Sequence, residues 1–452
     1  MTLLDAVQLT YQRAFMAETE ELGFILSSPG EVTIDGFSSR PIRVADVTDP
    51  KAVKLVSGTS VSTTSSGYSV RFGSNPGNGS RTFYAFSEAG IKCPVEIKAN
   101  QASTWHHEGQ GADMVIISHG DFMESLLPLK TLRETQGLSV ALIDVEDIYD
   151  EFSYGTKTPQ AIKDFLTRAS TSWQTPPRFV LLVGGASFDP RNYLGLGNTD
   201  FLPTKLLDTA YMETASDDWF VDFNGDGLPD MAVGRLPVQT PEEAAHVVSK
   251  LIAYDQAPSG NWTTEALMVA DQNDSFDFEG TSQIVSDLIP EQMRVSSVYR
   301  REAGNTAARA AILGSINEGK LILNYVGHGT VDLWRGDLLT ASDSPSLTNG
   351  VAMPFVVGMT CLNGFFHSPY VESLAEALLK AENGGAVAVW TSSGLTVPNE
   401  QSLMNKQLMR LLFNGQGLTL GEAAAQAKAA TQDMDVRRSW ILFGDPTTRL
   451  KQ

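Results

Sequence analysis

The first 110 residues show short stretches in which hydrophobic and polar positions alternate. The clearest stretches are Glu31 to Ile34, Tyr68 to Phe72 and Arg81 to Phe86, and turn-forming residues separate them. Alternation with a period of two is typical of strands that bury one face and expose the other. Residues 1–110 are therefore predicted to form a small β-sandwich domain.

From about residue 111 the alternation gives way to uninterrupted hydrophobic runs of four to six residues. These runs are Met114 to Ser118, Ser139 to Ile143, Phe179 to Val183, Leu267 to Ala270, Leu321 to Tyr325, Phe355 to Gly358 and Ala386 to Trp390. Such runs are typical of strands buried on both faces, which occur mainly in parallel sheets covered by helices.

Helical signals lie between these runs. Thr158-Pro159 and Thr240-Pro241 each combine an N-cap residue with a proline at the first helical position, and Glu243 completes a capping box with Thr240. Strands that alternate with helices predict an α/β fold with a mostly parallel sheet and helices on both faces. We divide it into residues 111–258 and 259–452, and expect functional side chains at the carboxyl ends of the strands.

Composition and charge limit the possible partners. Of 452 residues, 42% are hydrophobic and 19% are charged, as in ordinary folded proteins. The formal net charge of −20 would repel a phosphate backbone, so we expect no nucleic-acid partner. No apolar run approaches the roughly 18 residues needed to span a bilayer. Met1 to Ala14 also lacks the basic and then apolar order of a secretory signal.

Cysteine and histidine are scarce. Two cysteines, Cys93 and Cys361, make a disulfide framework improbable. His106 and His107, followed by Glu108, form a candidate metal pair, but neighbouring side chains point in opposite directions along an extended chain. A polar linker is the favoured interpretation of that segment.

Two expected strand ends carry residues suited to catalysis. His328 lies between Gly327 and Gly329 after one hydrophobic run, and Cys361 follows the next run after Met359 and Thr360. Parallel strands would place both residues at the same edge of the sheet, where the imidazole could accept the thiol proton. Taken singly, either residue could be structural, Cys361 as a small buried side chain and His328 as a turn residue.

The two motifs resemble those of the gingipain family of cysteine peptidases, whose catalytic unit has a caspase-like fold. The resemblance rests on Tyr325 to Gly329, on Thr360 to Gly364 and on the spacing between them, and covers roughly residues 110–452. It continues through Leu182 to Gly185, Val233 to Arg235, Glu372 to Lys380 and Phe443 to Pro446. The β-rich region before this unit is similar to one in larger members of the family.

The resemblance implies a cysteine endopeptidase that forms an acyl-enzyme. By it, Cys361 is the nucleophile, His328 carries the proton, and the amides of Gly329 and Cys361 form the oxyanion hole. Asp271 occupies the place of the family's acidic residue that helps to orient the imidazole, although it could also be a solvated loop residue. His119 also ends a strand, but no nucleophile motif accompanies it.

Specificity after Arg or Lys is a further implication, because gingipains place a carboxylate in the pocket for the residue before the cleaved bond. Aligning the following helix puts Asp277 at that position, with Asp274 and Glu279 as alternatives. A solvated acidic loop before a helix N-terminus explains the same residues, since the helix dipole favours carboxylates there.

An aspartate-rich segment predicts a structural Ca²⁺ site. Asp222, Asn224, Asp226 and Asp230 alternate with other residues, the carbonyl oxygen of Leu228 is the remaining candidate ligand, and Gly227 permits a sharp turn. The glutamate expected at position twelve of an EF-hand loop is absent, so an acidic turn that binds no metal is the alternative.

Two rival functions remain open. A sortase-like transpeptidase would pass the acyl group to an amine instead of water, and a non-catalytic, calcium-stabilised surface module would keep only the fold. The resemblance implies protein or peptide substrates and a secreted or cell-surface location in a bacterium. The chain is expected to be part of a longer protein.

Overall fold

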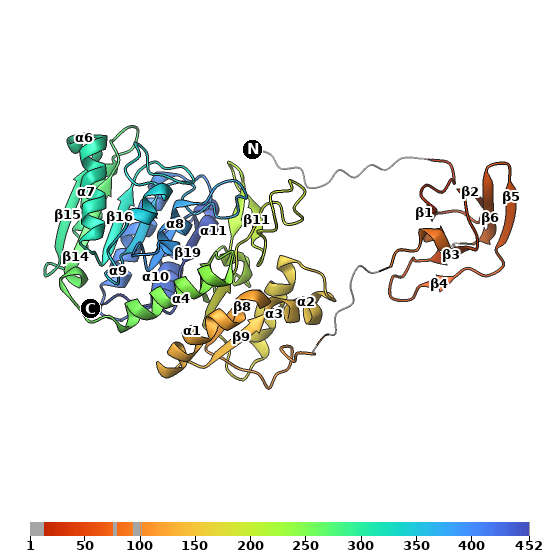
Figure 1. Cartoon of the computed structure of the whole chain (residues 1–452), viewed down its shortest axis with the longest axis horizontal. Helices are drawn as coiled ribbons and strands as arrows, with labels where there is room; N and C mark the ends of the chain where they lie inside the picture. The colour runs from red at the N-terminus through yellow and green to blue at the C-terminus, as the bar shows by residue number, and fades with distance from the viewer. Residues whose placement is uncertain (1–12, 76–78, 94–99, 101, 452) are drawn as a thin grey trace. The chain divides into compact units, whose positions relative to one another are not determined.

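The computed structural model describes residues 13–75, 79–93, 100 and 102–451. The chain divides into a compact unit Leu3–Gln101 and a second unit that contains Ala102–Gln452, and each is described by itself (Figure 1). Most of the Met1 to Ala14 segment lies outside the described residues. The division at residue 258 stays a prediction, since one sheet runs through both predicted parts.

The N-terminal unit contains two antiparallel sheets, ordered β1-β7-β3-β4 and β2-β6-β5. The strands are β1 Glu21–Leu26, β2 Gly30–Phe37, β3 Ile42–Asp46, β4 Lys54–Leu55, β5 Ser60–Thr64, β6 Gly67–Ser74 and β7 Arg81–Ser87, followed by the 3₁₀ helix η1 Glu88–Gly90. Ile34 and Phe72 from one sheet share a buried cluster with Val44 and Phe83 from the other. Two sheets that enclose one core make the predicted β-sandwich.

The second unit is built on a ten-stranded sheet with the order β15-β14-β16-β17-β18-β19-β13-β10-β8-β9. Its strands are β8 Met114–Ser118, β9 Val140–Asp144, β10 Phe179–Val183, β13 Ala232–Leu236, β14 Glu265–Ala270, β15 Arg294–Tyr299, β16 Ile322–Val326, β17 Phe355–Met359, β18 Ala388–Ser392 and β19 Trp440–Phe443. A separate hairpin pairs β11 Lys205–Asp208 with β12 Glu213–Ser216.

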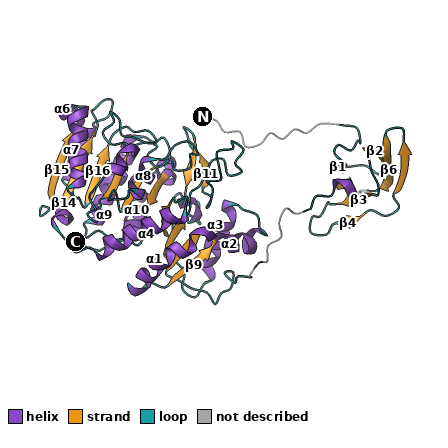
Figure 2. Ribbon diagram, viewed as in Figure 1, coloured by secondary structure: helices purple, strands orange, loops and turns teal. Residues whose placement is uncertain are grey.

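Helices alternate with these strands and cover the sheet (Figure 2). They are α1 Met123–Thr135, α2 Val145–Ser153, α3 Pro159–Ser172, α4 Pro241–Gln256, α5 Phe278–Ser286, α6 Arg300–Ala303, α7 Asn305–Asn317, α8 Leu374–Lys380, α9 Pro398–Leu412, α10 Leu420–Ala427 and α11 Met434–Ser439, with 3₁₀ helices η2 Gly120–Phe122, η3 Asp218–Phe220, η4 Asn261–Thr264, η5 Ala341–Ser346 and η6 Lys428–Ala430. Within the described part of the chain, no helix has the length and apolar character of a membrane span.

Both faces of the sheet are buried, as the uninterrupted hydrophobic runs predict. In β8, Met114 and Ile116 belong to the cluster that includes residues of α1 and α4, whereas Val115 and Ile117 belong to the cluster of α2 and α3. Because successive strand residues point to opposite faces, β8 is covered on both sides. The predicted α/β class with a mostly parallel sheet is confirmed.

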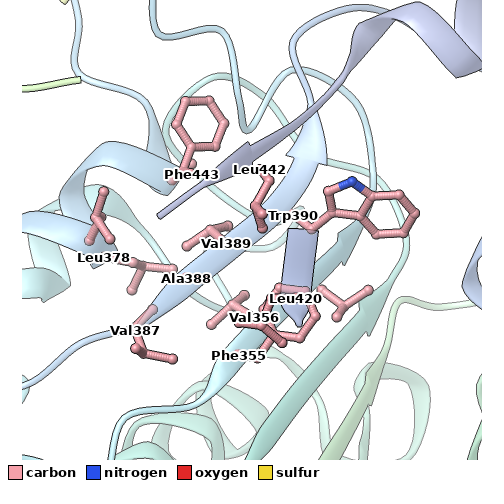
Figure 3. Close-up of a cluster of buried hydrophobic side chains, with 14 of the residues drawn as sticks. Phe355, Val356, Leu378, Val387, Ala388, Val389, Trp390, Leu420, Leu442 and Phe443 are labelled. Carbon is pink, nitrogen blue, oxygen red and sulfur yellow. The ribbon is translucent and has the colours of Figure 1, made fainter. Parts of the chain in front are cut away.

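The centre of the sheet shows how the core fixes its register. Figure 3 shows Phe355 and Val356 of β17 beside Val389 and Trp390 of β18, among the buried side chains of the cluster. Val356 pairs with Val389 in the parallel ladder. Slipping either strand by one residue would move these side chains to the opposite buried face, where the space is shaped for other side chains, so close packing favours this alignment.

Three strands of the ten-stranded sheet, β13, β15 and β19, are missing from the predicted runs. In β15, Ser296 and Ser297 interrupt the hydrophobic residues. β13 contains Gly234 and Arg235, and β19 is only four residues long, so neither gives a strong hydrophobic run. β13 pairs with β10 and β19, and the fully buried Arg235 is accommodated there by an ion pair with Asp217 at 2.5 Å. β19 runs antiparallel to β18, so the sheet is mixed at that point.

The two predicted helix starts are present with their caps. The hydroxyls of Thr158 and Thr240 accept hydrogen bonds from the amides of Gln160 and Glu243. The predicted capping box is wrong in one detail, because the Glu243 carboxylate accepts from the amide of Gln239 at 2.8 Å instead of that of Thr240.

Candidate active site

Three adjacent parallel strands, β14, β16 and β17, bring the predicted catalytic residues to one edge of the sheet. Ala270 pairs with Val326, and Val326 pairs with Met359, so the three strands end in register. Asp271 follows the end of β14 directly, and His328 and Cys361 lie two residues beyond β16 and β17. Neighbouring strands are about 5 Å apart, so these residues start from adjacent main-chain positions.

The main chain around His328 is held from several sides. Its carbonyl oxygen accepts hydrogen bonds from the Tyr325 hydroxyl at 2.7 Å and the Arg335 amide at 2.8 Å. Its own amide donates to Asp271 Oδ2 at 3.3 Å. Gly327 is required here, because a Cβ atom would lie 2.5 Å from Cβ of Asp271. The loop after β16 is therefore closely fitted to its surroundings.

The imidazole of His328 contacts a different carboxylate. Its Nε2 lies 2.8 Å from Asp274 Oδ2, and its ring meets the Phe278 ring edge to face at 5.2 Å between centroids. The side chain of His328 is 47% exposed and that of Asp274 is 37% exposed. The hydrogen bond from His328 holds the pKa of the Asp274 carboxyl below its usual value.

Asp271 is fully buried and lies against the main chain instead of the ring. Its Oδ1 accepts from Arg300 Nη1 and from the amide of Gln272, both at 2.7 Å. Arg335 Nη1 is 4.0 Å from Oδ2. Two guanidinium groups thus offset the cost of burying this carboxylate, and its predicted orienting role stays a prediction.

The thiol of Cys361 is partly buried and donates a hydrogen bond to the carbonyl oxygen of Thr396 at 3.5 Å. Burial raises the pKa of this thiol above its ordinary value of 9.0. Leu362, the next residue, has φ +63°, which is uncommon for a residue with a side chain. In this arrangement the thiol bonds to Thr396 and the imidazole to Asp274, and neither bonds to the other.

Asn363 joins the loop of the cysteine to the loop of the histidine. Its Nδ2 donates to the carbonyl oxygen of Thr330 at 2.6 Å, and its Oδ1 accepts from Trp334 Nε1 at 2.8 Å. Trp334 in turn stacks on Tyr325, with 4.1 Å between ring centroids. Sequence reasoning gave Asn363 no role, although a polar amide two residues past the candidate nucleophile was the available signal.

The amides predicted to form the oxyanion hole lie in these same loops. Among the described residues, no acceptor takes up the amide hydrogens of Gly329 or Cys361. A Cβ atom on Gly329 would lie 2.6 Å from Thr360 Oγ1 and 3.0 Å from the Leu333 carbonyl oxygen, so the loop is too tight for any side chain there.

Asp277 is the N-cap of α5. Its Oδ1 accepts from the amide of Gly280 at 2.9 Å and from Asn273 Nδ2 at 2.6 Å, while the side chain is exposed. The alternative carboxylate Glu279 forms an ion pair with Arg301 at 2.7 Å. Of the two carboxylate oxygens of Asp277, Oδ1 therefore accepts the hydrogen bond that caps the helix, and Oδ2 does not take part in the cap.

The aspartate-rich loop bonds largely to itself. Asp222 accepts from the amides of Gly225 at 2.7 Å and Gly227 at 2.9 Å, and Asp226 accepts from the amide of Leu228 at 2.9 Å. The remaining predicted ligands also face loop amides: Asn224 accepts from Asp226, and Asp230 from Phe223. Within the described ranges, no three acidic, histidine or cysteine side chains converge on a common point.

The other histidines considered have structural partners. The His106 ring contacts Glu151, which also accepts from the amides of Trp105 at 2.8 Å and His106 at 2.9 Å and so fastens this segment to α2. His119 Nδ1 accepts from the amide of Asp121 at 3.3 Å and caps η2. Both cysteines are free thiols.

A mostly parallel α/β sheet with a histidine and a cysteine at adjacent strand ends is the arrangement expected of a caspase-like cysteine peptidase. The sequence profile of peptidase family C25 matches residues 107–451, and the chain belongs to this family. Membership confirms the predicted resemblance to the gingipains and the predicted class of cysteine-type peptidase.

Known relatives are distant in sequence. Lys-gingipain W83 of Porphyromonas gingivalis is 25% identical over 293 residues, which cover 62% of this chain. The match spans only 15% of that relative's length. The chain is therefore similar to one part of a much longer protein.

Solved structures show the same fold. The Arg-specific cysteine proteinase gingipain R matches with a TM-score of 0.60 and 21% identity, over 80% of each chain. Dimeric latent PorU from Porphyromonas gingivalis matches 96% of this chain and 39% of its own, with a TM-score of 0.51 and 19% identity.

Proposed function

We propose that this protein is a cysteine endopeptidase in which Cys361 is the nucleophile and His328 carries the proton. The observation that supports this most directly is the register of β16 and β17, which starts both residues from adjacent positions at one sheet edge. Asn363 hydrogen-bonds the loop that carries Cys361 to the loop that carries His328. This contact supports the same assignment, because it holds the proposed nucleophile beside the proposed base.

The proposed reaction begins when Cys361 gives its proton to His328 and the sulfur attacks the peptide carbonyl carbon. The amides of Gly329 and Cys361, which lack acceptors among the described residues, would bind the negative oxygen that forms. His328 then returns the proton to the departing amine, and an acyl-enzyme remains. Water, deprotonated by His328, attacks the acyl carbon, the C–S bond breaks and the carboxylic acid product leaves. The proton on His328 then returns to the sulfur and restores the thiol.

Asp271 enters this proposal as the residue that fixes the position of the histidine loop. Its contact with the amide of His328 at 3.3 Å and its complete burial support that role. Because substrate-free catalytic geometries are often loose, the thiol and imidazole are expected to approach each other when a peptide binds.

We further propose that the enzyme prefers Arg or Lys before the cleaved bond, with Asp277 facing the basic side chain. The position of Asp277 directly before Phe278, whose ring contacts the imidazole of His328, supports this. A carboxylate paired with a guanidinium rejects apolar side chains, because they leave it unpaired.

A structural Ca²⁺ ion and a secreted or cell-surface location complete the proposal. Carboxylate, amide and carbonyl oxygens are ligands suited to Ca²⁺, and each Asp222 oxygen that accepts one loop amide keeps a second lone pair. Asp222, Asn224, Asp226, Asp230 and the carbonyl of Leu228 would hold the ion, with the outer carboxylates turning inward.

A peptide-library cleavage profile tests the enzymatic proposal. Wild type and Cys361→Ala are incubated with the library, with and without Ca²⁺, and both are titrated with a thiol-reactive peptide ketone. We expect cleavage and stoichiometric labelling of the wild type alone. Equal cleavage by the alanine variant would refute the proposed nucleophile, and added amine nucleophiles would report any transfer to amines.

A further inference from the structure

We propose that Asp274, and not Asp271, is the carboxylate that orients the imidazole of His328. This inference rests on the proposed function, because it assigns a positioning residue to the proposed catalytic histidine. Four features carry it: the bond to the ring, the geometry that holds Asp274, the engagement of Asp271 elsewhere, and the difference in burial.

The bond to the ring selects one tautomer of His328. Asp274 Oδ2 lies 2.8 Å from Nε2, and an ionised carboxylate can only accept a hydrogen bond, so Nε2 carries the hydrogen. Among the described residues, Nδ1 has no hydrogen-bond partner. Nδ1 is thus left as the nitrogen with a free lone pair for the thiol proton.

The loop after β14 holds Asp274 in a defined position. Its Oδ1 accepts from the amide of Phe276 at 3.1 Å, while its own amide donates to the Phe276 carbonyl oxygen at 3.2 Å. Phe276 packs on Phe278, and Phe278 packs against the imidazole. One carboxylate oxygen is therefore anchored to the loop and the other faces the ring.

Asp271 has no comparable freedom. Its Oδ1 is shared by Arg300 and the amide of Gln272, and its Oδ2 faces the amide of His328. Turning Asp271 toward the ring would break the ion pair between Arg300 and this buried carboxylate, which is a costly change. The two carboxylates consequently have different roles: Asp271 fixes the position of the loop that carries His328, and Asp274 fixes the orientation of the imidazole ring.

These different roles predict opposite effects of the two asparagine variants on melting temperature and on kcat. Asp274 is 37% exposed, so Asp274→Asn should leave the melting temperature within about 2 °C of wild type and lower kcat roughly tenfold or more with little change in KM. Asp274→Glu should recover part of the loss. Asp271→Asn should lower the melting temperature markedly, because Arg300 loses its buried partner.

The decisive experiment combines kinetics with ¹⁵N NMR of histidine side chains in the full chain. Wild type, Asp274→Asn, Asp274→Glu, Asp271→Asn and the control Asp287→Asn are compared. Asp287 is an exposed residue at the opposite end of α5. We expect the Nε2–H tautomer of His328 in wild type and in Asp287→Asn, and loss of that preference in Asp274→Asn.

Several outcomes would overturn the inference. They are an Nδ1–H tautomer of His328 in the wild type, an unchanged kcat in Asp274→Asn, or a KM increase confined to substrates with Arg or Lys before the cleaved bond. The last result would assign Asp274 to substrate binding. Failure of the proposed function is distinguishable, because Cys361→Ala would then equal wild type while the NMR comparison still reports on the contact between Asp274 and His328.

Discussion

His328 and Cys361 each stand two residues beyond the end of a strand, and the two strands are parallel neighbours in which Val326 pairs with Met359. The equal offset places both side chains at the same level of the sheet edge. Asn363 then binds the loop of one to the loop of the other. The relationship between the proposed base and the proposed nucleophile is thus built into the ladder of main-chain hydrogen bonds.

Replacing Cys361 by alanine should abolish peptide hydrolysis and leave the melting curve nearly unchanged. The thiol makes one hydrogen bond, at 3.5 Å, so little stability depends on it. His328→Ala should lose almost as much activity, because groups that act as one unit do not contribute additively. Hydrolysis rates and thermal melts check both variants, and substantial turnover by Cys361→Ala would contradict the assignment.

The thiol of the substrate-free enzyme should react slowly with iodoacetamide at neutral pH. Burial raises the pKa of Cys361 above 9.0, so less than about 1% is thiolate at pH 7. The alkylation rate should therefore rise steeply between pH 8 and 10. Cys361→Ala corrects for reaction at Cys93, and a rate that is already maximal at pH 6 would mean that His328 deprotonates the thiol before substrate arrives.

Calcium should raise the melting temperature through the Asp222 to Asp230 loop. A ligand that binds only the folded state stabilises it by RT ln(1 + [L]/Kd), about 2.7 kcal/mol at a hundredfold excess over Kd. The double variant Asp222→Ala, Asp226→Ala should show no shift. If addition of chelator does not shift the melting curve of the wild type, the loop is an acidic turn that binds no Ca²⁺.

Asp277→Asn should weaken the preference for Arg or Lys without weakening the helix. Asparagine caps a helix about as well as aspartate, so the hydrogen bond to the amide of Gly280 is kept while the charge is removed. Asp277→Ala serves as the comparison, since it loses the cap as well, at about 1 kcal/mol. A wild-type library profile dominated by apolar or acidic residues would show that no basic pocket exists here.

Glu376→Gln should change how stability depends on pH. Burial raises the pKa of Glu376 to about 7 from 4.5, although Lys380 opposes the shift. A raised folded-state pKa means that this stabilisation is complete below about pH 4.5 and is lost as the pH rises to about 7, on the order of 3 kcal/mol. Melting temperatures from pH 5 to 8 should fall more for wild type than for the glutamine variant, and parallel profiles would contradict this.

The sequence by itself determined most of the strands of the sheet and the pairing of the two catalytic candidates. Strands buried on both faces must be hydrophobic at every position, which makes them visible as runs such as Leu321 to Tyr325 and Phe355 to Gly358. Parallel strands share one carboxyl edge, so motifs that follow two neighbouring runs are expected together. The sequence pattern did not reveal β13, β15 and β19, because Arg235 in β13, Ser296 and Ser297 in β15 and the short length of β19 weaken it.

Only the tertiary structure decided which carboxylate serves which part of His328. Asp271 and Asp274 lie three residues apart in one acidic stretch, and either could reach a histidine at the next strand end. Arg300, 29 residues further along, binds Asp271 at 2.7 Å and leaves Asp274 to the ring. A charge that is buried must find an opposite charge wherever the fold supplies one, and that partner is set by packing between distant segments, which no local pattern records.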